Sequence, residues 1–147
     1  MSADPPVDPR GPRFAAWVTT VVLAVVLVIG WWPLLAAQAV VFAAGAFAGL
    51  RYAPYSLLYR HLVAPRLAPA SEREDAAPLR FAQAVGFGFA VVGVIGYASG
   101  ATILGIIATA LALAAAFLNA AFAFCLGCEA YLLIQRFRPQ QKESALP

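Results

Sequence analysis

Charged residues are scarce in this chain. Asp, Glu, Lys and Arg make up 12% of its 147 residues, and 63% are hydrophobic, whereas a soluble globular domain has about 25% charged residues. The composition therefore excludes an ordinary soluble domain. Histidine occurs once and cysteine twice, which is too few for the four ligands of a structural zinc ion. We expect neither a metal site nor a cofactor.

Basic runs interleaved with aromatic residues are also absent. The net charge of +3 comes from arginines outside the apolar runs and one lysine. Such a distribution favours an anionic lipid surface over nucleic acid as the partner.

Long apolar runs dominate what is present. A helix of about 20 apolar residues crosses a bilayer, and the sequence predicts four such spans, with the fourth extended as a helix: 14–30, 34–50, 81–98 and 102–125, extended to 137. We expect an all-α polytopic membrane protein with its four transmembrane helices in two hairpins. The single membrane domain, 14–137, lies between a cytoplasmic arm, 1–13, and a cytoplasmic tail, 138–147.

The last apolar run is too long for one simple crossing. Its 37 residues from 101 to 137 would form a helix of about 55 Å, against about 40–45 Å for a bilayer with its headgroups. Part of the run must project, tilt or break, and Gly127 is the expected break.

The central region, 51–80, is the largest polar segment. Residues 52–63 are aromatic and basic, and they predict a short interfacial helix that begins near Pro54 and is stopped by Pro65. Ser71 and Glu74 have the spacing of a capping box. His61 is interpreted as an interfacial anchor.

Charge placement predicts the orientation. All ten Lys and Arg residues precede the first span, lie between the second and third, or follow the fourth, and the turns near 31 and 99 carry no charge. By the positive-inside rule both termini and the central region are cytoplasmic. We expect the inner membrane of a bacterium.

The two hairpins begin alike, with Arg13-Phe14-Ala15 and Arg80-Phe81-Ala82. A parallel repeat of two-helix units would explain the likeness. A common way of starting a span from the basic side would explain it equally well.

Cys125 and Cys128 are three positions apart in the cytoplasmic half of the fourth span, so a structural disulfide of an oxidising compartment is not expected. One interpretation is a reversible dithiol, and another is two free cysteines packed as small hydrophobes. A helix C-terminus and Glu129 both disfavour a thiolate. That objection weakens if the helix breaks and Cys128 begins a new one.

Four segments carry a resemblance to a known family: 8–14, 54–55 with 65–66, 79–86, and Phe-Cys-Leu-Gly-Cys at 124–128. Together they resemble small four-span bacterial, often actinobacterial, membrane proteins catalogued as a domain of unknown function, over residues 8–135. The resemblance implies no catalytic residue. Because such proteins tend to be encoded near thioredoxin-like or sulfurtransferase-like proteins, it implies a cytosolic partner of that kind.

Two functional hypotheses follow. In the first, Cys125 and Cys128 are the redox pair of a thiol-disulfide or sulfur-relay protein, with Glu129 as a modulator. In the second, the chain is a non-enzymatic membrane subunit or a small-solute permeation protein with structural cysteines, and a second copy of the chain is a further candidate partner. An aqueous path lined by Gln38, Gln83, Asn119 and Thr109 would support the second hypothesis, and a tightly filled bundle would count against it.

Overall fold

The computed structural model describes residues 10–66 and 76–137. The described residues are almost entirely helical and contain no strand, which confirms the all-α class. Six α-helices follow one another: α1 (Arg10–Ile29), α2 (Trp32–Ala43), α3 (Pro54–Leu58), α4 (Ala76–Ser99), α5 (Thr102–Phe122) and α6 (Leu126–Arg136). Most of the predicted arm, the cap at Ser71 and Glu74, and the tail from 138 lie outside the described residues.

Two helices begin earlier than the hydropathy pattern predicts. The first span was expected from 14 and the third from 81, whereas α1 begins at Arg10 and α4 at Ala76. Each includes a proline in its first turn, Pro12 or Pro78, where a missing N–H removes no helical hydrogen bond. The first turns therefore extend each helix beyond its apolar run.

Tighter and wider helical turns connect α2 to the central region. A π-helix (Ala44–Ala48) continues α2 and ends at Gly49, whose φ of +117° suits glycine. A 3₁₀ turn (Leu50–Tyr52) leads into α3, which begins at Pro54 as predicted. A π-helix (Tyr59–Val63) and a 3₁₀ turn (Ala64–Arg66) follow α3.

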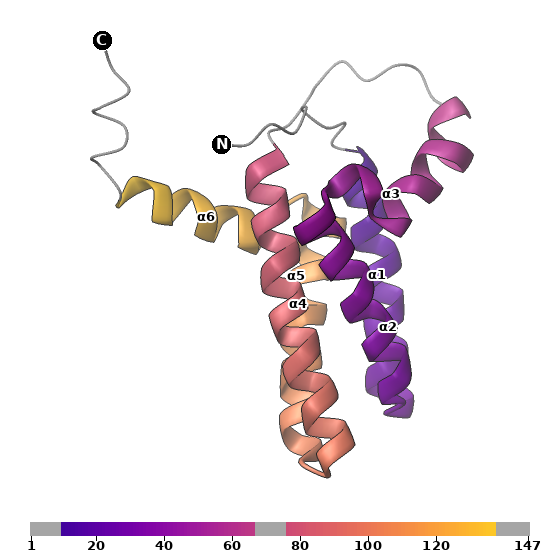
Figure 1. The fold of residues 1–147 in the computed structure, drawn as a ribbon, viewed down its shortest axis with the longest axis vertical. Coiled ribbons are helices and arrows are strands. Elements are labelled where there is room, and N and C mark those ends of the chain that lie inside the picture. The colour runs from indigo at the N-terminus through magenta and orange to yellow at the C-terminus, as the bar shows by residue number, and fades with distance from the viewer. Residues whose placement is uncertain (1–9, 67–75, 138–147) are drawn as a thin grey trace.

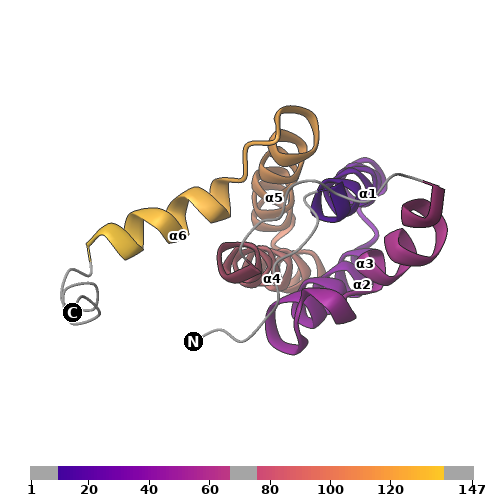
Figure 2. The same cartoon turned by 90° about the horizontal axis from the view of Figure 1, so that it is seen from above.

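The four longest helices form a bundle of two hairpins. Around it, α1 packs against α5, α5 against α4, α4 against α2, and α2 more loosely against α1 (Figure 2). Both hairpin turns lie at one end of the bundle, and α3 and α6 lie at the other (Figure 1). Gly30 and Gly100 form the turns with φ of +67° and +92°.

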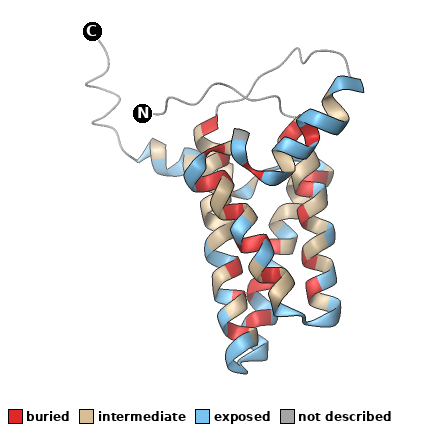
Figure 3. Cartoon of the chain, turned by 45° about the vertical axis from the view of Figure 1, so that its right-hand side comes forward, coloured by how far each residue is buried: buried red, intermediate tan, exposed pale blue. Residues whose placement is uncertain are grey.

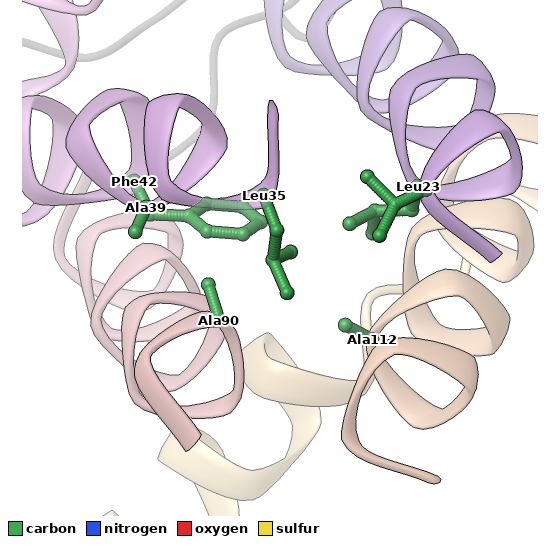
Figure 4. Packing of buried hydrophobic residues seen from close by; sticks show 7 residues of the cluster. Leu23, Leu35, Ala39, Phe42, Ala90 and Ala112 are labelled. Carbon is green, nitrogen blue, oxygen red and sulfur yellow. The ribbon is translucent and has the colours of Figure 1, made fainter. Parts of the chain in front are cut away.

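The bundle core fills the half nearer the hairpin turns. Large side chains such as Leu23 and Leu35 are fully buried, and they meet Phe42 and the small residues Ala90 and Ala112 in one cluster (Figure 4). Small residues bring helices close: a Cβ on Gly96 of α4 would lie 2.5 Å from the backbone nitrogen of Gly105 of α5.

Many apolar side chains face outward. Val28, Val40 and Ile103 are exposed on the outer faces of the bundle, while buried residues face its interior (Figure 3). Three helices are long and apolar enough to cross a membrane: α1, α4 and α5. The apolar helix Trp32–Ala48 is shorter, so the fourth span stays a prediction.

The two halves of the chain make equivalent contacts at the α3 and α6 end. Arg13 of α1 donates to the carbonyl of Ala120 in α5 at 3.0 Å, and Arg80 of α4 donates to the carbonyl of Ala46 after α2 at 3.1 and 2.7 Å. Each arginine thus caps the C-terminal end of a helix in the other hairpin. The adjacent phenylalanines also correspond, because Phe14 contacts Tyr59 and Phe81 contacts Tyr131.

The break in the last apolar run is not at Gly127. The helix α5 ends at Phe122, and Gly127 lies inside the first turn of α6. Ala123 makes the break with a left-handed φ of +56°. Its N–H donates to the carbonyl of Asn119 at 3.1 Å, and that of Phe124 donates to Leu118 at 3.2 Å. These bonds satisfy free carbonyls at the end of α5. The sequence does not predict this helix end, because glycine is the usual residue at such a position and Ala123 occupies it.

Candidate functional site

Cys125 and Cys128 are joined by a disulfide at the start of α6. Cys125 is the N-cap residue, with extended backbone angles, and its Sγ accepts a hydrogen bond from the N–H of Cys128 at 3.1 Å. Their Cα atoms lie 5.2 Å apart, within the usual range for a disulfide. Both cysteines are half-buried. The interpretation as two free, packed cysteines is therefore wrong.

The chain break reverses the electrostatic setting expected for this pair. Because α5 ends at Phe122 and α6 begins at Leu126, the cysteines lie at a helix N-terminus, where free N–H groups and the helix dipole favour negative charge. Glu129 lies in the same first turn and is exposed.

The helix α6 is held against α4 by a close backbone approach. A Cβ on Gly127 would lie 2.6 Å from the Cβ and 2.7 Å from the Cα of Ala82, so only glycine allows this separation. One turn further along, Tyr131 packs on Phe81 and accepts a hydrogen bond from Gln135 at 2.9 Å. The disulfide therefore lies beside a fixed helix contact.

A cavity of about 320 Å³ adjoins the cysteine pair inside the bundle. All six α-helices contribute to its wall, which is mostly apolar and rich in alanine. Its polar lining residues come from α1, α3, α4, α5 and the start of α6: Thr19, Tyr55, Ser56, Gln83, Asn119 and Cys125.

One side of the cavity carries a hydrogen-bonded network. Gln38, which is almost fully buried, accepts a hydrogen bond from the Tyr55 hydroxyl at 2.7 Å and donates to Thr19 at 3.5 Å. Burial raises the pKa of Tyr55 above its ordinary value of 10.0, which keeps the phenol neutral and able to donate. This network joins α1, α2 and α3.

The opposite side carries polar groups without partners. Gln83 of α4 and Asn119 of α5 line the cavity, and within 10–66 and 76–137 their side-chain amides make no hydrogen bond. Both amides can therefore bind a polar group placed in the cavity.

The four polar residues that would line an aqueous path, Gln38, Gln83, Asn119 and Thr109, do not all line the cavity. Gln83 and Asn119 share the cavity, whereas Gln38 belongs to the network described above. Thr109 is buried with its hydroxyl unpaired, near Gly93 and the core. These polar groups are therefore divided among the cavity, the hydrogen-bonded network and the core.

Two residues of the site could not be found from sequence patterns. Thr19 lies in an apolar run and Tyr55 in an aromatic segment, and only the fold brings them to Gln38. Among the described residues no three His, Cys, Asp or Glu side chains form a cluster that could hold a metal ion.

Comparison with known proteins gives one match. The family model described as "Domain of unknown function (DUF4395)" matches residues 7–136. No curated protein and no solved structure matches the chain.

Proposed function

We propose that this chain, which belongs to the DUF4395 family, is a membrane protein of thiol-disulfide exchange with Cys125 and Cys128 as its redox pair. The family expected from the sequence motifs is thereby confirmed. The observation that carries the proposal is the N-cap position of Cys125, whose sulfur accepts the N–H of Cys128 at 3.1 Å. A hydrogen bond to sulfur and a helix N-terminus both favour the thiolate, which is the reactive form.

In this proposal four helices cross the inner membrane of a bacterium: α1, α2 with its π-helical continuation, α4 and α5. The segment Trp32–Ala48 has 17 residues and a length of about 25 Å, which is short but within the range of transmembrane helices. Large apolar side chains of α6 are exposed, together with Phe137 just after it: Leu126, Leu132, Leu133 and Ile134. This exposed apolar surface suits a helix that lies in the membrane surface.

The basic residues support a cytoplasmic position for the redox pair. Arg13, Arg60, Arg80 and Arg136 belong to segments at the α3 and α6 end, and the residues of the two hairpin turns carry no charge. The positive-inside rule then places this end, with Cys125, toward the cytosol.

The proposed reaction is dithiol exchange with a cytosolic thioredoxin-like protein. A partner thiolate attacks the sulfur of Cys125, the Cys125–Cys128 bond breaks, and Cys128 leaves as a thiolate that takes up a proton. The partner's second thiolate then attacks its own sulfur in the mixed disulfide and releases Cys125. The partner loses two electrons and two protons, which the cysteine pair gains. In a sulfur relay, the thiolate of reduced Cys125 attacks the outer sulfur of a persulfide on a sulfurtransferase-like donor, a persulfide forms on Cys125, and the donor cysteine leaves as a thiolate.

The first test measures thiol reactivity in the purified protein. In the Cys128→Ser variant, Cys125 should be alkylated at neutral pH faster than Cys128 is in the Cys125→Ser variant, because only the Cys125 sulfur occupies the N-cap position. Mass spectrometry of the alkylated peptides gives both rates. Equal rates would remove the structural basis for assigning Cys125 as the attacked sulfur.

The same preparation tests the exchange. The oxidised wild-type protein is mixed with a thioredoxin that lacks its resolving cysteine, and a mixed disulfide through Cys125 should accumulate. The Cys125→Ser/Cys128→Ser variant is the matched control and should form none. Failure of the wild-type protein to form a mixed disulfide with this or any reduced dithiol protein would refute the proposal.

The permeation alternative has less support. The cavity could hold a small solute, but Gln38 and Thr109 are almost fully buried and do not line it. A non-enzymatic subunit role leaves the N-cap geometry of Cys125 unexplained.

A further inference from the structure

The geometry points to a second redox partner: we propose that the cavity beside Cys125 binds a lipid-soluble quinone, which reoxidises the Cys125–Cys128 dithiol. This inference rests on the proposed dithiol exchange. A pair that is reduced from the cytosol must pass its electrons on before it can react again. Cys125 lines the cavity, so an acceptor held there would lie beside the sulfur.

The shape and lining of the cavity suit an apolar ring. Its volume of about 320 Å³ is at the lower end of the range for small-molecule sites, about 300–1,000 Å³. Alanine and other apolar residues of α1, α4 and α5 form most of the wall. A ligand that reaches this cavity from the bilayer has to be lipid-soluble.

The two unpaired amides favour a ligand that carries hydrogen-bonding atoms. Gln83 and Asn119 lie on α4 and α5 and line the cavity with no hydrogen-bond partner within the described parts of the chain. Each amide can donate an N–H to a carbonyl oxygen. A quinone has two carbonyl oxygens on an apolar ring. A lipid acyl chain carries no hydrogen-bonding group and would leave both amides unpaired.

The reaction balances between the pair and the quinone. The two thiols lose their protons, an S–S bond forms between Cys125 and Cys128, and the released electron pair reduces the quinone. The two carbonyl oxygens take up two protons and become the hydroxyls of a quinol. Quinones are soluble in the membrane and accept two electrons with two protons, which matches what a dithiol releases.

The test begins with the reduced wild-type protein, freed of reductant and reconstituted in lipid nanodiscs. Decyl-ubiquinone is the probe, because its fully substituted ring cannot alkylate a thiol. Addition of the quinone should consume two thiols per chain and form one quinol, measured by thiol titration and by the quinone absorbance. Binding without chemistry is measured by equilibrium titration of the Cys125→Ser/Cys128→Ser variant.

Variants locate the binding site. Gln83→Leu and Asn119→Leu should each weaken quinone binding about tenfold through the loss of one hydrogen bond. Ser99→Leu is the control, since Ser99 is exposed at the end of α4 beside the hairpin turn and outside the cavity lining, and it should leave binding unchanged. Ala115→Phe, which fills the cavity from α5, provides an independent variant and should abolish binding.

The outcomes separate this inference from the proposed function. If quinone leaves the thiols reduced while the oxidised protein still forms a mixed disulfide with thioredoxin, the inference is wrong and the proposed function stands. If both reactions fail, the proposed function fails with it. Quinone oxidation that is equally fast in the cavity variants and the wild type would overturn the assignment of the cavity.

Discussion

The position of Cys125 at the start of α6 depends on the conformation of a single residue two positions before it. Ala123 has a left-handed φ of +56°, which costs a non-glycine residue about 1–2 kcal/mol. This angle ends α5 and lets Cys125 cap α6. The sulfur of Cys125 therefore lies at the N-terminus of a helix and not at the C-terminus of one. The unfavourable angle persists because the contact of α6 with α4 compensates for it.

Glu129 should slow the reaction of Cys125. It is the one acidic side chain in the described part of the chain, and it lies in the same first turn as Cys128. In the Cys128→Ser background, Glu129→Gln should speed alkylation of Cys125 about twofold. An exposed charge changes the free energy of the thiolate, relative to the thiol, by only a few tenths of a kcal/mol. The gain should disappear near 1 M salt. Rates are followed with a chromogenic alkylating reagent.

Arg136 provides the control for this charge effect. It lies at the far end of α6, about 15 Å along the helix from Leu126, which exceeds the screening length at physiological salt. Arg136→Gln should leave the alkylation rate unchanged. A rate that is insensitive to Glu129→Gln at low salt would show that this carboxylate does not modulate the pair.

At the scale of elements, the site is formed by one helix docked on another. Gly127 of α6 lies so close to Ala82 of α4 that an added Cβ would meet both the Cβ and the Cα of Ala82. Phe81 and Tyr131 extend the contact by one turn. The orientation of the disulfide toward the cavity therefore depends on this one crossing.

Gly127→Ala should separate α6 from α4. Because the clash involves backbone atoms, it cannot be relieved by a rotamer change, and overpacking of this kind costs about 1–3 kcal/mol. We expect a lower unfolding midpoint in detergent and faster reduction of the disulfide by a small dithiol. Gly88→Ala is the matched control, since a Cβ there would meet nothing within 4 Å. Equal midpoints for the two variants would contradict the docking contact.

Sequence patterns predicted the long helices better than their ends. Apolar runs indicate α1, α4 and α5 because bilayer crossing sets their length. The break at Ala123 could not be predicted, since alanine favours a right-handed helix and the nearby Gly127 has the stronger intrinsic tendency to break one. The contact with Ala82 needs a glycine inside α6, so Gly127 remains helical and the break lies at Ala123. The cysteine pair was recognisable from its spacing, but its partners Gln83 and Asn119 only become a site through the bundle.

At the scale of the whole molecule, the two halves of the chain share one plan. Each half contains a helical hairpin with a glycine turn, a left-handed or positive-φ residue, an extended N-cap residue and a shorter helix. Ala53 and Cys125 occupy the corresponding N-cap positions, and both line the cavity. Only the second half carries cysteines. The disulfide beside the cavity therefore has no counterpart in the first half, although the backbone plan is repeated.

Both hairpin turns lie at one end of the bundle (Figure 1), so the proposed topology puts them on one side of the membrane. Ser99, beside the second turn, and His61, in the π-helix after α3, are exposed at opposite ends of the bundle. In a Cys125→Ser/Cys128→Ser background, Ser99→Cys should react with a membrane-impermeant maleimide in intact cells, because the uncharged turns face outward by the positive-inside rule. His61→Cys should react only after the cells are permeabilised. The reverse labelling pattern would invert the orientation and place the redox pair on the outer side of the membrane. The redox partner would then have to be a protein of the outer compartment.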